Sequence, residues 1–282
     1  MIYHKKLRLM CVTLFVSIIV FACKQECRQS ITINGSTTLE TFIKSAAGTF
    51  EKSHVVKINI ITSGSLSGLA ALLDGKSDIA DSSVKMPAEQ LWNAQKKGVM
   101  VKEFLIGYDI IVPIVHPSNK VKNLFIGQLS DIYAGLLRYW KDVGGNQGNI
   151  IVVDRNDNSG TKLVMSERFF ESTKIAPGSI KRNSDTDVVS YVARHPAAVG
   201  YISKRCCGNK VKSININGFD GIKENVEKGY YPLYRELYLY VNEKSYKGEI
   251  KSLIGFIMNT AGQDLLQKAG FIPVSCMNKL SK

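Results

Sequence analysis

Short runs of β-branched and other apolar residues alternate along this chain with longer segments in which apolar residues recur at helical spacing. The first cycle predicts a strand over residues 31–33 and a helix over residues 39–50, and the second begins with a strand over residues 55–61. Repeated strand and helix units of this kind are typical of an α/β protein whose strands are mainly parallel. The pattern therefore constrains the chain to sheets that are flanked by helices.

The chain is long enough for two lobes, since it has 282 residues of which 45% are apolar. No long linker rich in proline, serine or glycine separates such lobes, so the chain is expected to cross between them through ordered strands. The continuous apolar runs over residues 110–115 and 237–241 are the candidates for these crossing strands. Lobe I would combine residues 30–108 with residues 238–282, and lobe II would comprise residues 109–237.

Residues 1–22 form a basic start followed by a short apolar run, which is the pattern of a secretory signal peptide. The run is too short for a helix that spans the ~30 Å of hydrocarbon in a bilayer. Its end, with Ala22 directly before Cys23, is similar to a bacterial lipobox, in which cleavage precedes a lipid-modified cysteine. We expect Cys23 to carry the lipid and residues 23–29 to form the tether of an anchored, not spanning, protein. Alternatively, the leader is an ordinary cleaved signal and Cys23 is incidental.

The chain carries 37 Lys and Arg residues against 24 Asp and Glu residues, a formal charge of +13. Such a charge favours nucleic acid, an acidic surface or a small anion as the partner. The basic residues are spread along the chain without a basic motif interleaved with aromatic residues, so nucleic-acid binding is not expected. A general field that attracts a small anion is the simplest interpretation.

The cysteines and histidines indicate neither a metal site nor a bound cofactor. Beyond Cys23 the cysteines are Cys27, Cys206, Cys207 and Cys276, and none has the spacing of a zinc site. In an extracytoplasmic compartment they would form one or two disulfides, or all four are buried thiols; the sequence leaves both possibilities open. The four histidines are scattered and are expected in loops or on the surface.

Two segments that imitate catalytic motifs are incomplete. Residues 75–77 read Gly-Lys-Ser like the end of a P-loop, but that motif needs another glycine five residues earlier, where the chain has Ala70. Residues 64–68 have Leu66 at the place where a nucleophile elbow needs serine. We therefore do not expect an enzyme.

Three turns rich in hydroxyl groups and glycine follow predicted strands, at residues 35–38, 63–68 and 81–83. Each is expected at the start of the next helix, where unpaired backbone N–H groups and the helix dipole attract an anion. Parallel strands bring such turns to one edge of a sheet. A single turn of this kind is explained as well by helix capping, but their succession favours an anion site.

A fourth turn, at residues 155–161, adds a cation to these neutral donors. Arg155 offers a planar fork of donors that matches two oxygens of a tetrahedral oxyanion. Asp157 is close enough in sequence to hold this fork in place. Ser159, Gly160 and Thr161 would then supply hydroxyl and backbone donors at a helix start.

The order of these turns, GSTT, SGSLSG, SDIADSS and RNDNSGT, resembles the phosphate-binding proteins of bacterial ABC-type phosphate importers, the PstS family of the periplasmic binding proteins. The similarity extends over about residues 30–275 and includes the segments GYDIIVPIVHP, YWKDVGG, AVGYIS, GFDG and YPLYRELYLYV. It implies a type II, two-lobed fold in which two mainly parallel sheets flanked by helices are joined by two crossing strands. By matching motif, the resemblance assigns phosphate donors to Thr37, Thr38, Ser65, Ser83, Arg155, Ser159, Gly160 and Thr161.

One position departs from the family pattern. Members with serine at position 83 commonly have arginine next, whereas this chain has Val84, which would leave its site with one cation fewer. Phosphate near neutral pH still bears a proton, so a buried carboxylate that accepts its hydrogen bond could reject sulfate by a factor on the order of 10⁴ to 10⁵. Asp109 is the first candidate for this acceptor, and Asp81 or Asp157 is the next. Asp109 is explained equally well as a strand-end cap.

The resemblance implies an extracytoplasmic lipoprotein that captures inorganic phosphate between its lobes and delivers it to the subunits of an ABC permease. It would act as a monomer, without a cofactor and without nucleic acid, and only its lipid would attach it to the membrane. The alternatives are a lipoprotein adhesin or other host-interaction module, and a binding protein for another tetrahedral oxyanion.

Overall fold

The computed structural model describes residues 29–170 and 174–276. The expected signal peptide, Cys23 and Cys27 lie outside the described residues, so the structure does not bear on the lipid anchor. Gln29, the last residue of the expected tether, is already the first residue of a strand.

The strands predicted at residues 31–33, 55–61, 110–115 and 237–241 correspond to β1, β2, β4 and β11, whereas the short strands β5, β7, β9, β10 and β12 were not predicted. The strands pair in the order β2-β1-β3-β11-β4-β8-β6-β7, with β9 and β12 added to β4 and with β5 and β10 as a separate pair. Neighbours within the series β2-β1-β3 and β8-β6-β7 are parallel, whereas β11 is antiparallel to β3 and β4, and β4 to β8. The bounds are β1 (Gln29–Gly35), β2 (Val56–Ile61), β3 (Ile79–Ser82), β4 (Val101–Val115), β5 (Asn123–Leu124), β6 (Ile151–Arg155), β7 (Ile180–Arg182), β8 (Ala198–Ser203), β9 (Lys212–Ser213), β10 (Asn215–Ile216), β11 (Tyr234–Asn242) and β12 (Ile272–Pro273).

Helices alternate with these strands, which makes the fold mixed α/β as predicted. They are α2 (Glu40–Phe50), α3 (Ser65–Leu73), α4 (Ala88–Lys96), α5 (Ile126–Ala134), α6 (Gly160–Val164), α7 (Asp185–Val192), α8 (Lys223–Glu227), α9 (Gly248–Met258) and α10 (Thr260–Lys268). A π-helical turn, η2 (Met165–Phe169), continues α6, and short 3₁₀ turns are η1 (Trp140–Val143), η3 (Lys204–Cys206), η4 (Glu243–Ser245) and η5 (Val274–Cys276).

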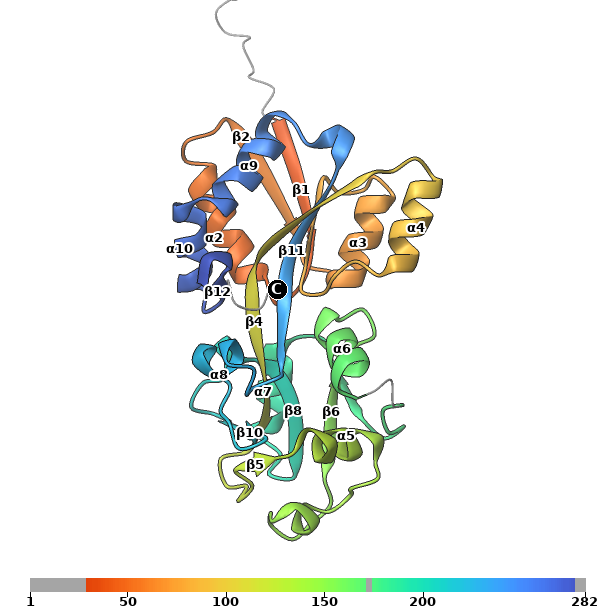
Figure 1. Ribbon diagram of the computed structural model, residues 1–282, viewed down its shortest axis with the longest axis vertical. Coiled ribbons are helices and arrows are strands. Elements are labelled where there is room, and N and C mark those ends of the chain that lie inside the picture. The colour runs from red at the N-terminus through yellow and green to blue at the C-terminus, as the bar shows by residue number, and fades with distance from the viewer. Residues whose placement is uncertain (1–28, 171–173, 277–282) are drawn as a thin grey trace, which may run out of the picture.

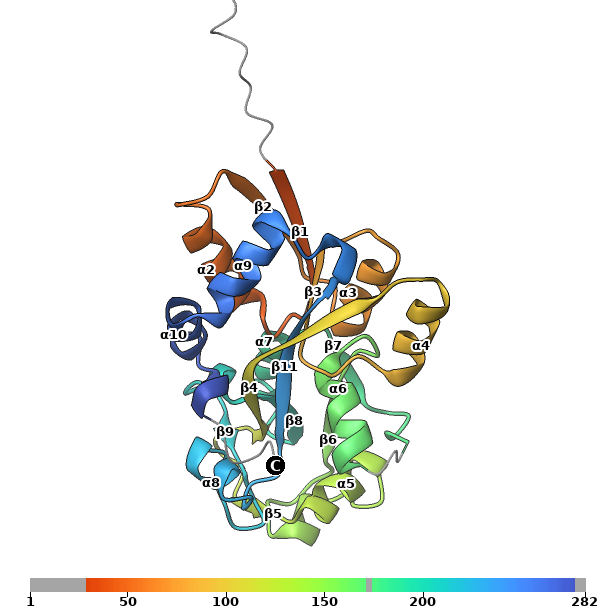
Figure 2. The same ribbon diagram turned by 45° about the horizontal axis from the view of Figure 1, so that its top comes forward.

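These elements gather into two groups that β4 and β11 connect (Figure 1). We call β1–β3, α2–α4, α9 and α10 the upper half, and β5–β10 with α5–α8 the lower half. The first part of β4 pairs with β11, and its last residues, Ile111 to Val115, pair with β8. Turning the molecule shows the same two strands running between the halves (Figure 2). The runs at 110–115 and 237–241 that the sequence nominated are therefore parts of the connecting strands.

Each half has hydrophobic side chains of its own at its centre. In the upper half, Phe42, Leu253 and Leu266 from α2, α9 and α10 lie in one buried cluster, and Leu69 and Leu72 from α3 lie in another. Figure 1 shows these two helix groups on opposite sides of the upper strands. The cluster of the lower half draws nearly all its residues from the chain between Tyr108 and Leu233. The buried apolar residues of the two halves thus divide the chain near Tyr108 and Leu233, where β4 and β11 pass from one half to the other.

Three of the four cysteines that the sequence leaves open lie in the described residues. Cys206, Cys207 and Cys276 are free thiols, each half-buried, so no disulfide forms among these three. Burial raises the pKa of the Cys206 thiol to about 11, which keeps it protonated. Within the described ranges, no group of His, Cys, Asp and Glu side chains is arranged to hold a metal ion. None of the helices of residues 29–170 and 174–276 has the length and apolarity to cross a bilayer.

The upper core yields a direct test of the packing. Replacing the fully buried Leu253 by alanine removes apolar contacts and leaves a cavity, so we expect the free energy of unfolding to fall by about 2–5 kcal/mol. Lys251→Ala, on the exposed side of the same helix α9, is the matched control and should change it by less than about 0.5 kcal/mol. Urea unfolding followed by circular dichroism measures both; equal effects of the two variants would contradict this packing.

Candidate anion-binding site

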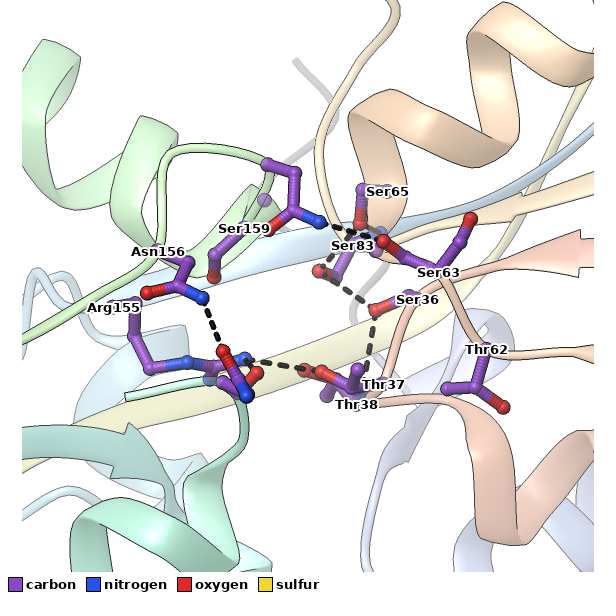
Figure 3. Close-up of a pocket in the computed structure, with 14 residues that line it drawn as sticks. Ser36, Thr37, Thr38, Thr62, Ser63, Ser65, Ser83, Arg155, Asn156 and Ser159 are labelled. Atoms are coloured by element: carbon purple, nitrogen blue, oxygen red, sulfur yellow. Dashed lines mark hydrogen bonds between the residues drawn. The ribbon is translucent and has the colours of Figure 1, made fainter. Parts of the chain in front are cut away.

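Loops from both halves meet around one cavity of about 250 Å³. This is smaller than the ~300–1,000 Å³ usual for drug-sized ligands, and its size suits a small guest. Figure 3 shows side chains from the upper half facing Arg155, Asn156 and Ser159 across it. The lining residues are Ser36, Thr37, Thr38, Thr62, Ser63, Gly64, Ser65, Ser83, Arg155, Asn156, Asn158, Ser159, Gly160 and Asn183.

The hydroxyl groups of the first two turns do not cap helices; Ser36 Oγ donates to Ser83 Oγ, and Ser63 Oγ donates to Asn34 Oδ1. Leu39 occupies the N-cap position of α2 and Gly64 that of α3, and neither helix has a side-chain cap. Gly64 has φ +100°, a conformation that favours glycine, and a Cβ there would lie 2.8 Å from the carbonyl oxygen of Asn158. The turn therefore brings the upper half into close contact with the loop after β6.

The third turn differs from its expected place. Asp81 and Ser82 belong to β3, and α4 begins only at Ala88, so Ser83 does not stand at a helix N-terminus. Ser83 joins the site through hydroxyl contacts instead: Ser36 Oγ donates to Ser83 Oγ at 3.1 Å, and Ser65 Oγ lies 3.2 Å from it. The prediction that this turn stands at a helix start and attracts an anion there is therefore wrong, although its serine does line the cavity.

The fourth turn enters from the lower half. Arg155 ends β6 and is only 1% exposed, and Ser159 caps α6 by accepting a hydrogen bond from the Lys162 N–H at 3.4 Å. A Cβ at Gly160 would lie 2.6 Å from Ser65 Oγ and 2.8 Å from Ser83 Oγ. Only glycine allows this approach, so the two halves touch at the back of the cavity.

Arg155 is held by a different carboxylate from the one that the sequence suggests. Its Nη1 donates to Asp185 Oδ1 in a buried ion pair, and its Nη2 donates to Thr37 Oγ1 at 3.0 Å and to the Asn183 carbonyl at 2.9 Å. Asp157 is exposed and pairs with Lys162, whose hydrogen bond lowers the pKa of Asp157. The expectation that Asp157 orients Arg155 is therefore wrong, because the side chain points to solvent.

One nitrogen atom of Arg155 has no hydrogen-bond partner in the described part of the chain. Its Nε–H is buried and has no partner among the residues that the structure describes. Buried N–H groups normally have a partner, and an unpaired one costs on the order of 1–3 kcal/mol. An acceptor that enters the cavity would remove this cost.

Comparison with known proteins decides the family. The model of the PBP superfamily domain matches residues 24–260 of this chain. Phosphate-binding protein PstS of Bacillus subtilis (strain 168) is 28% identical over 259 residues, which cover 88% of this chain and 82% of that protein. A structure from Clostridium perfringens, described as a phosphate ABC transporter substrate-binding protein with bound phosphate, is 32% identical with a TM-score of 0.81 and covers 87% of this chain and 100% of that one.

The chain belongs to the PstS family of the PBP superfamily. An ABC-type phosphate transport receptor from Vibrio cholerae is also similar, with 28% identity, a TM-score of 0.74 and coverage of 86% of this chain and 99% of that one. The resemblance carried by the four turns is thereby confirmed, and so is the α/β fold of this class. The family is one of binding proteins and not of enzymes.

In this PstS-family chain, Asp109 lies behind the cavity and not in its wall. Its Oδ2 accepts hydrogen bonds from Arg235 Nε at 3.0 Å and Nη2 at 2.7 Å, and its Oδ1 accepts one from Ser203 Oγ at 2.5 Å. Both oxygens are engaged by the protein. The assignment of Asp109 as the acceptor for a ligand proton is therefore wrong for this arrangement, and so is the alternative of a strand-end cap, because Asp109 lies within β4.

Arg235 also changes the expectation about Val84. The Arg235 side chain is fully buried on β11, and its Nη1 lies 3.2 Å from Ser83 Oγ. A second cation therefore lies directly behind the cavity wall, despite the valine that follows Ser83. Thr161 is the one expected donor that does not line the cavity; its Oγ1 accepts a hydrogen bond from Arg235.

Several site residues were not predicted. Some of them stand within turns that the sequence singled out, so the polar neighbours in those turns were a signal that these residues could line the site. They are Ser36, Ser63, Asn156 and Asn158. Asn183 and Arg235 lie far from those turns in sequence, and no local pattern marks them. The residues that sequence reasoning missed are Ser36, Thr62, Ser63, Gly64, Asn156, Asn158, Asn183, Asp185 and Arg235.

Asp81 supports the first turn by a hydrogen bond but does not line the cavity. Its Oδ2 accepts a hydrogen bond from the Ser36 N–H at 3.0 Å, and a Cβ at Gly35 would lie 1.8 Å from its carbonyl oxygen. Burial raises the pKa of Asp81 to about 7, although the hydrogen bond from Ser36 opposes this. No carboxylate lines the cavity in the part of the chain that the structure describes.

The raised pKa of Asp81 predicts a pH dependence of stability. A carboxyl group whose pKa is higher in the folded chain stabilises the fold when protonated, so its contribution is complete below about pH 4 and lost as the pH rises through 7. At about 1.4 kcal/mol per pKa unit, the loss is on the order of 4 kcal/mol. Asp81→Asn cannot titrate and should lack this part of the slope. Chemical unfolding at pH 4 to 8 measures it; parallel curves for wild type and variant would refute the assignment.

Proposed function

We propose that this protein binds inorganic phosphate in the cavity between its halves and delivers it to an ABC-type phosphate permease. The observation that carries the proposal is the convergence of seven of the eight expected donors, from four separate chain segments, on one small cavity. Family membership supports it, since the relatives reported above are phosphate-binding proteins by name and one was solved with phosphate.

Capture would replace the water around the anion by donors that are already in position. The wall offers serine and threonine hydroxyl groups, asparagine side chains and one guanidinium, and hydrogen bonds within the wall hold several of these groups in position. Because Arg155 is paired with Asp185, the charge of the anion would be balanced mainly by dipoles and by the uncommitted Nε–H. No covalent step is involved.

We further propose that the two halves are the lobes of a type II binding protein, with lobe I at residues 30–108 and 238–282 and lobe II at residues 109–237. The separate hydrophobic clusters support these borders. Closure around β4 and β11 would bring the turns together and exclude water. Contacts across the halves, such as Arg155 to Thr37 and Asn158 Nδ2 to the Ser63 carbonyl at 2.7 Å, are those expected of the closed form.

The leader motif supports an extracytoplasmic place for this lobed domain. Residues 1–22 would be removed, Cys23 would carry lipid, and residues 23–29 would tether the domain to a bacterial membrane. Anchored there as a monomer, the protein would hold phosphate close to the permease subunits. The membrane contact would be through the lipid alone.

A buried carboxylate does not explain selection against sulfate here, because no carboxylate lines the described wall of the cavity. With neutral oxygens in the described wall, the P–OH group of phosphate would donate to an amide, hydroxyl or carbonyl oxygen. Such an acceptor favours the protonated anion but does not repel sulfate by charge. We expect sulfate to bind more weakly than phosphate, by less than the ~10⁴ that a carboxylate acceptor could provide.

Calorimetric titration of the mature domain tests this function. Phosphate and arsenate, which have similar shape and protonation, should bind and compete. Arg155→Ala should weaken phosphate binding about 100-fold or more, because a charge-assisted donor is lost and Asp185 is left as an unpaired buried charge. Arg138→Ala, an equal change of charge at an exposed residue of the lower half, is the control and should leave affinity unchanged.

The same titration separates the alternatives. An adhesin or host-interaction module would show no phosphate binding, and a protein for another oxyanion would prefer that anion over phosphate. Unchanged phosphate affinity in Arg155→Ala would count against the cavity as the binding site.

The two aspartates near Arg155 provide a matched pair of variants. Asp185→Asn should weaken phosphate binding about tenfold, because the guanidinium loses the ionised partner that orients it. Asp157→Asn, in the loop of Arg155 itself, should leave affinity within about twofold because its carboxylate is exposed and pairs with Lys162. Titration calorimetry of both variants decides between them, and the reverse order of effects would restore the role first suggested for Asp157.

A further inference from the structure

Arg235 is a buried cation that the binding cavity does not expose. It lies on β11, directly opposite Asp109 of β4 in the register of the two connecting strands. Its guanidinium is fully buried, and Asp109 accepts two of its hydrogen bonds. An ion pair of this kind would be complete by itself, yet the guanidinium has further contacts.

These further contacts are to hydroxyl oxygens of the binding site. Arg235 Nη2 donates to Thr38 Oγ1 at 3.1 Å, and Nη1 donates to Ser83 Oγ at 3.2 Å and to Thr161 Oγ1. Thr38 and Ser83 belong to the upper half and Thr161 to the lower half. One side chain therefore connects donors of both halves.

The direction of these hydrogen bonds is fixed by chemistry. A guanidinium has five N–H donors and no acceptor, so each of the three hydroxyl oxygens must be the acceptor. A hydroxyl group that accepts from Arg235 keeps its own O–H to donate elsewhere. Ser83 Oγ also accepts from Ser36 Oγ, so its own proton is left to donate, either to Ser65 Oγ at 3.2 Å or to a guest in the cavity.

We propose that Arg235 is a positioning residue that sets the hydroxyl groups of Thr38 and Ser83 as donors toward the anion, while its contact with Thr161 holds the lower half against them. The inference rests on the proposed phosphate function and deepens it, because it assigns specificity to a residue that does not touch the ligand. A wall whose hydroxyls are held as donors favours a guest with acceptor oxygens on every side, such as a tetrahedral oxyanion. Asp109 in turn holds the guanidinium in place.

A double-mutant cycle tests this role. Arg235→Lys keeps a cation for Asp109, but an ammonium group cannot reach three hydroxyls and the carboxylate together. We expect phosphate affinity, measured by calorimetry, to fall at least about tenfold in the wild-type background. In the Thr38→Val background, which has already lost one of the oriented hydroxyls of the cavity wall, the same replacement should cost several-fold less. A purely structural role would give equal losses in both backgrounds and would overturn the proposal.

The control and the second variant separate binding from folding. Arg205→Lys is the matched control: Arg205 also connects the halves, through the Thr38 carbonyl, but orients no hydroxyl of the site, so affinity should stay within about twofold. Arg235→Met combined with Asp109→Leu removes the buried pair without leaving a lone charge, and should fold with a Tm close to wild type yet bind phosphate at least about tenfold more weakly. Wild-type affinity in either folded Arg235 variant overturns this inference alone. Absence of phosphate binding by the wild type overturns the proposed function, and this inference with it.

Discussion

The antiparallel pairing of β4 with β11 is the interaction on which the other features depend. These two strands are the only long elements of the described chain that run between the halves, and their register sets Asp109 opposite Arg235. A charged pair buried at that point is costly unless every donor and acceptor has a partner. The partners come from both halves, namely Ser203 and Thr161 from the lower and Thr38 and Ser83 from the upper. The same pairing therefore joins the halves and organises the floor of the cavity.

The electrostatics of the site follow from this arrangement. Each of the two guanidinium groups next to the cavity has its own carboxylate, Asp185 for Arg155 and Asp109 for Arg235. The cavity thus presents oriented dipoles more than net charge, and the overall charge of +13 contributes a long-range field for an anion. Fixed neutral donors can bind an anion while leaving little unpaired charge when it departs, which suits a protein that must also release its cargo.

The sequence predicted much of the fold and half of the residues that line the cavity. Strand and helix alternation located β1, α2, β2 and α3 closely, because apolar periodicity is a local property. The turns at residues 35–38, 63–68 and 155–161 line the cavity because parallel strands carry their following loops to a common edge. Ser83 was assigned correctly to the wall although the reason given, a helix start, does not apply.

The errors share a physical origin, which is that sequence proximity was used where only spatial proximity matters. Asp157 is two residues from Arg155 and points to solvent, while Asp185, thirty residues away, makes the buried pair. Asp109 was the first candidate for the acceptor, beside a strand-end cap, because nothing local shows that β11 places Arg235 across from it.

The amino-acid order alone determined the class of fold, the four donor turns and the cation at residue 155, since each depends on residues close together in the chain. Only the tertiary structure decided which carboxylate holds which arginine, that Thr161 lies behind the wall, and that no described carboxylate enters the cavity. Those outcomes depend on strand register and on the contact between halves, where side chains distant in sequence compete for the same hydrogen-bond partners.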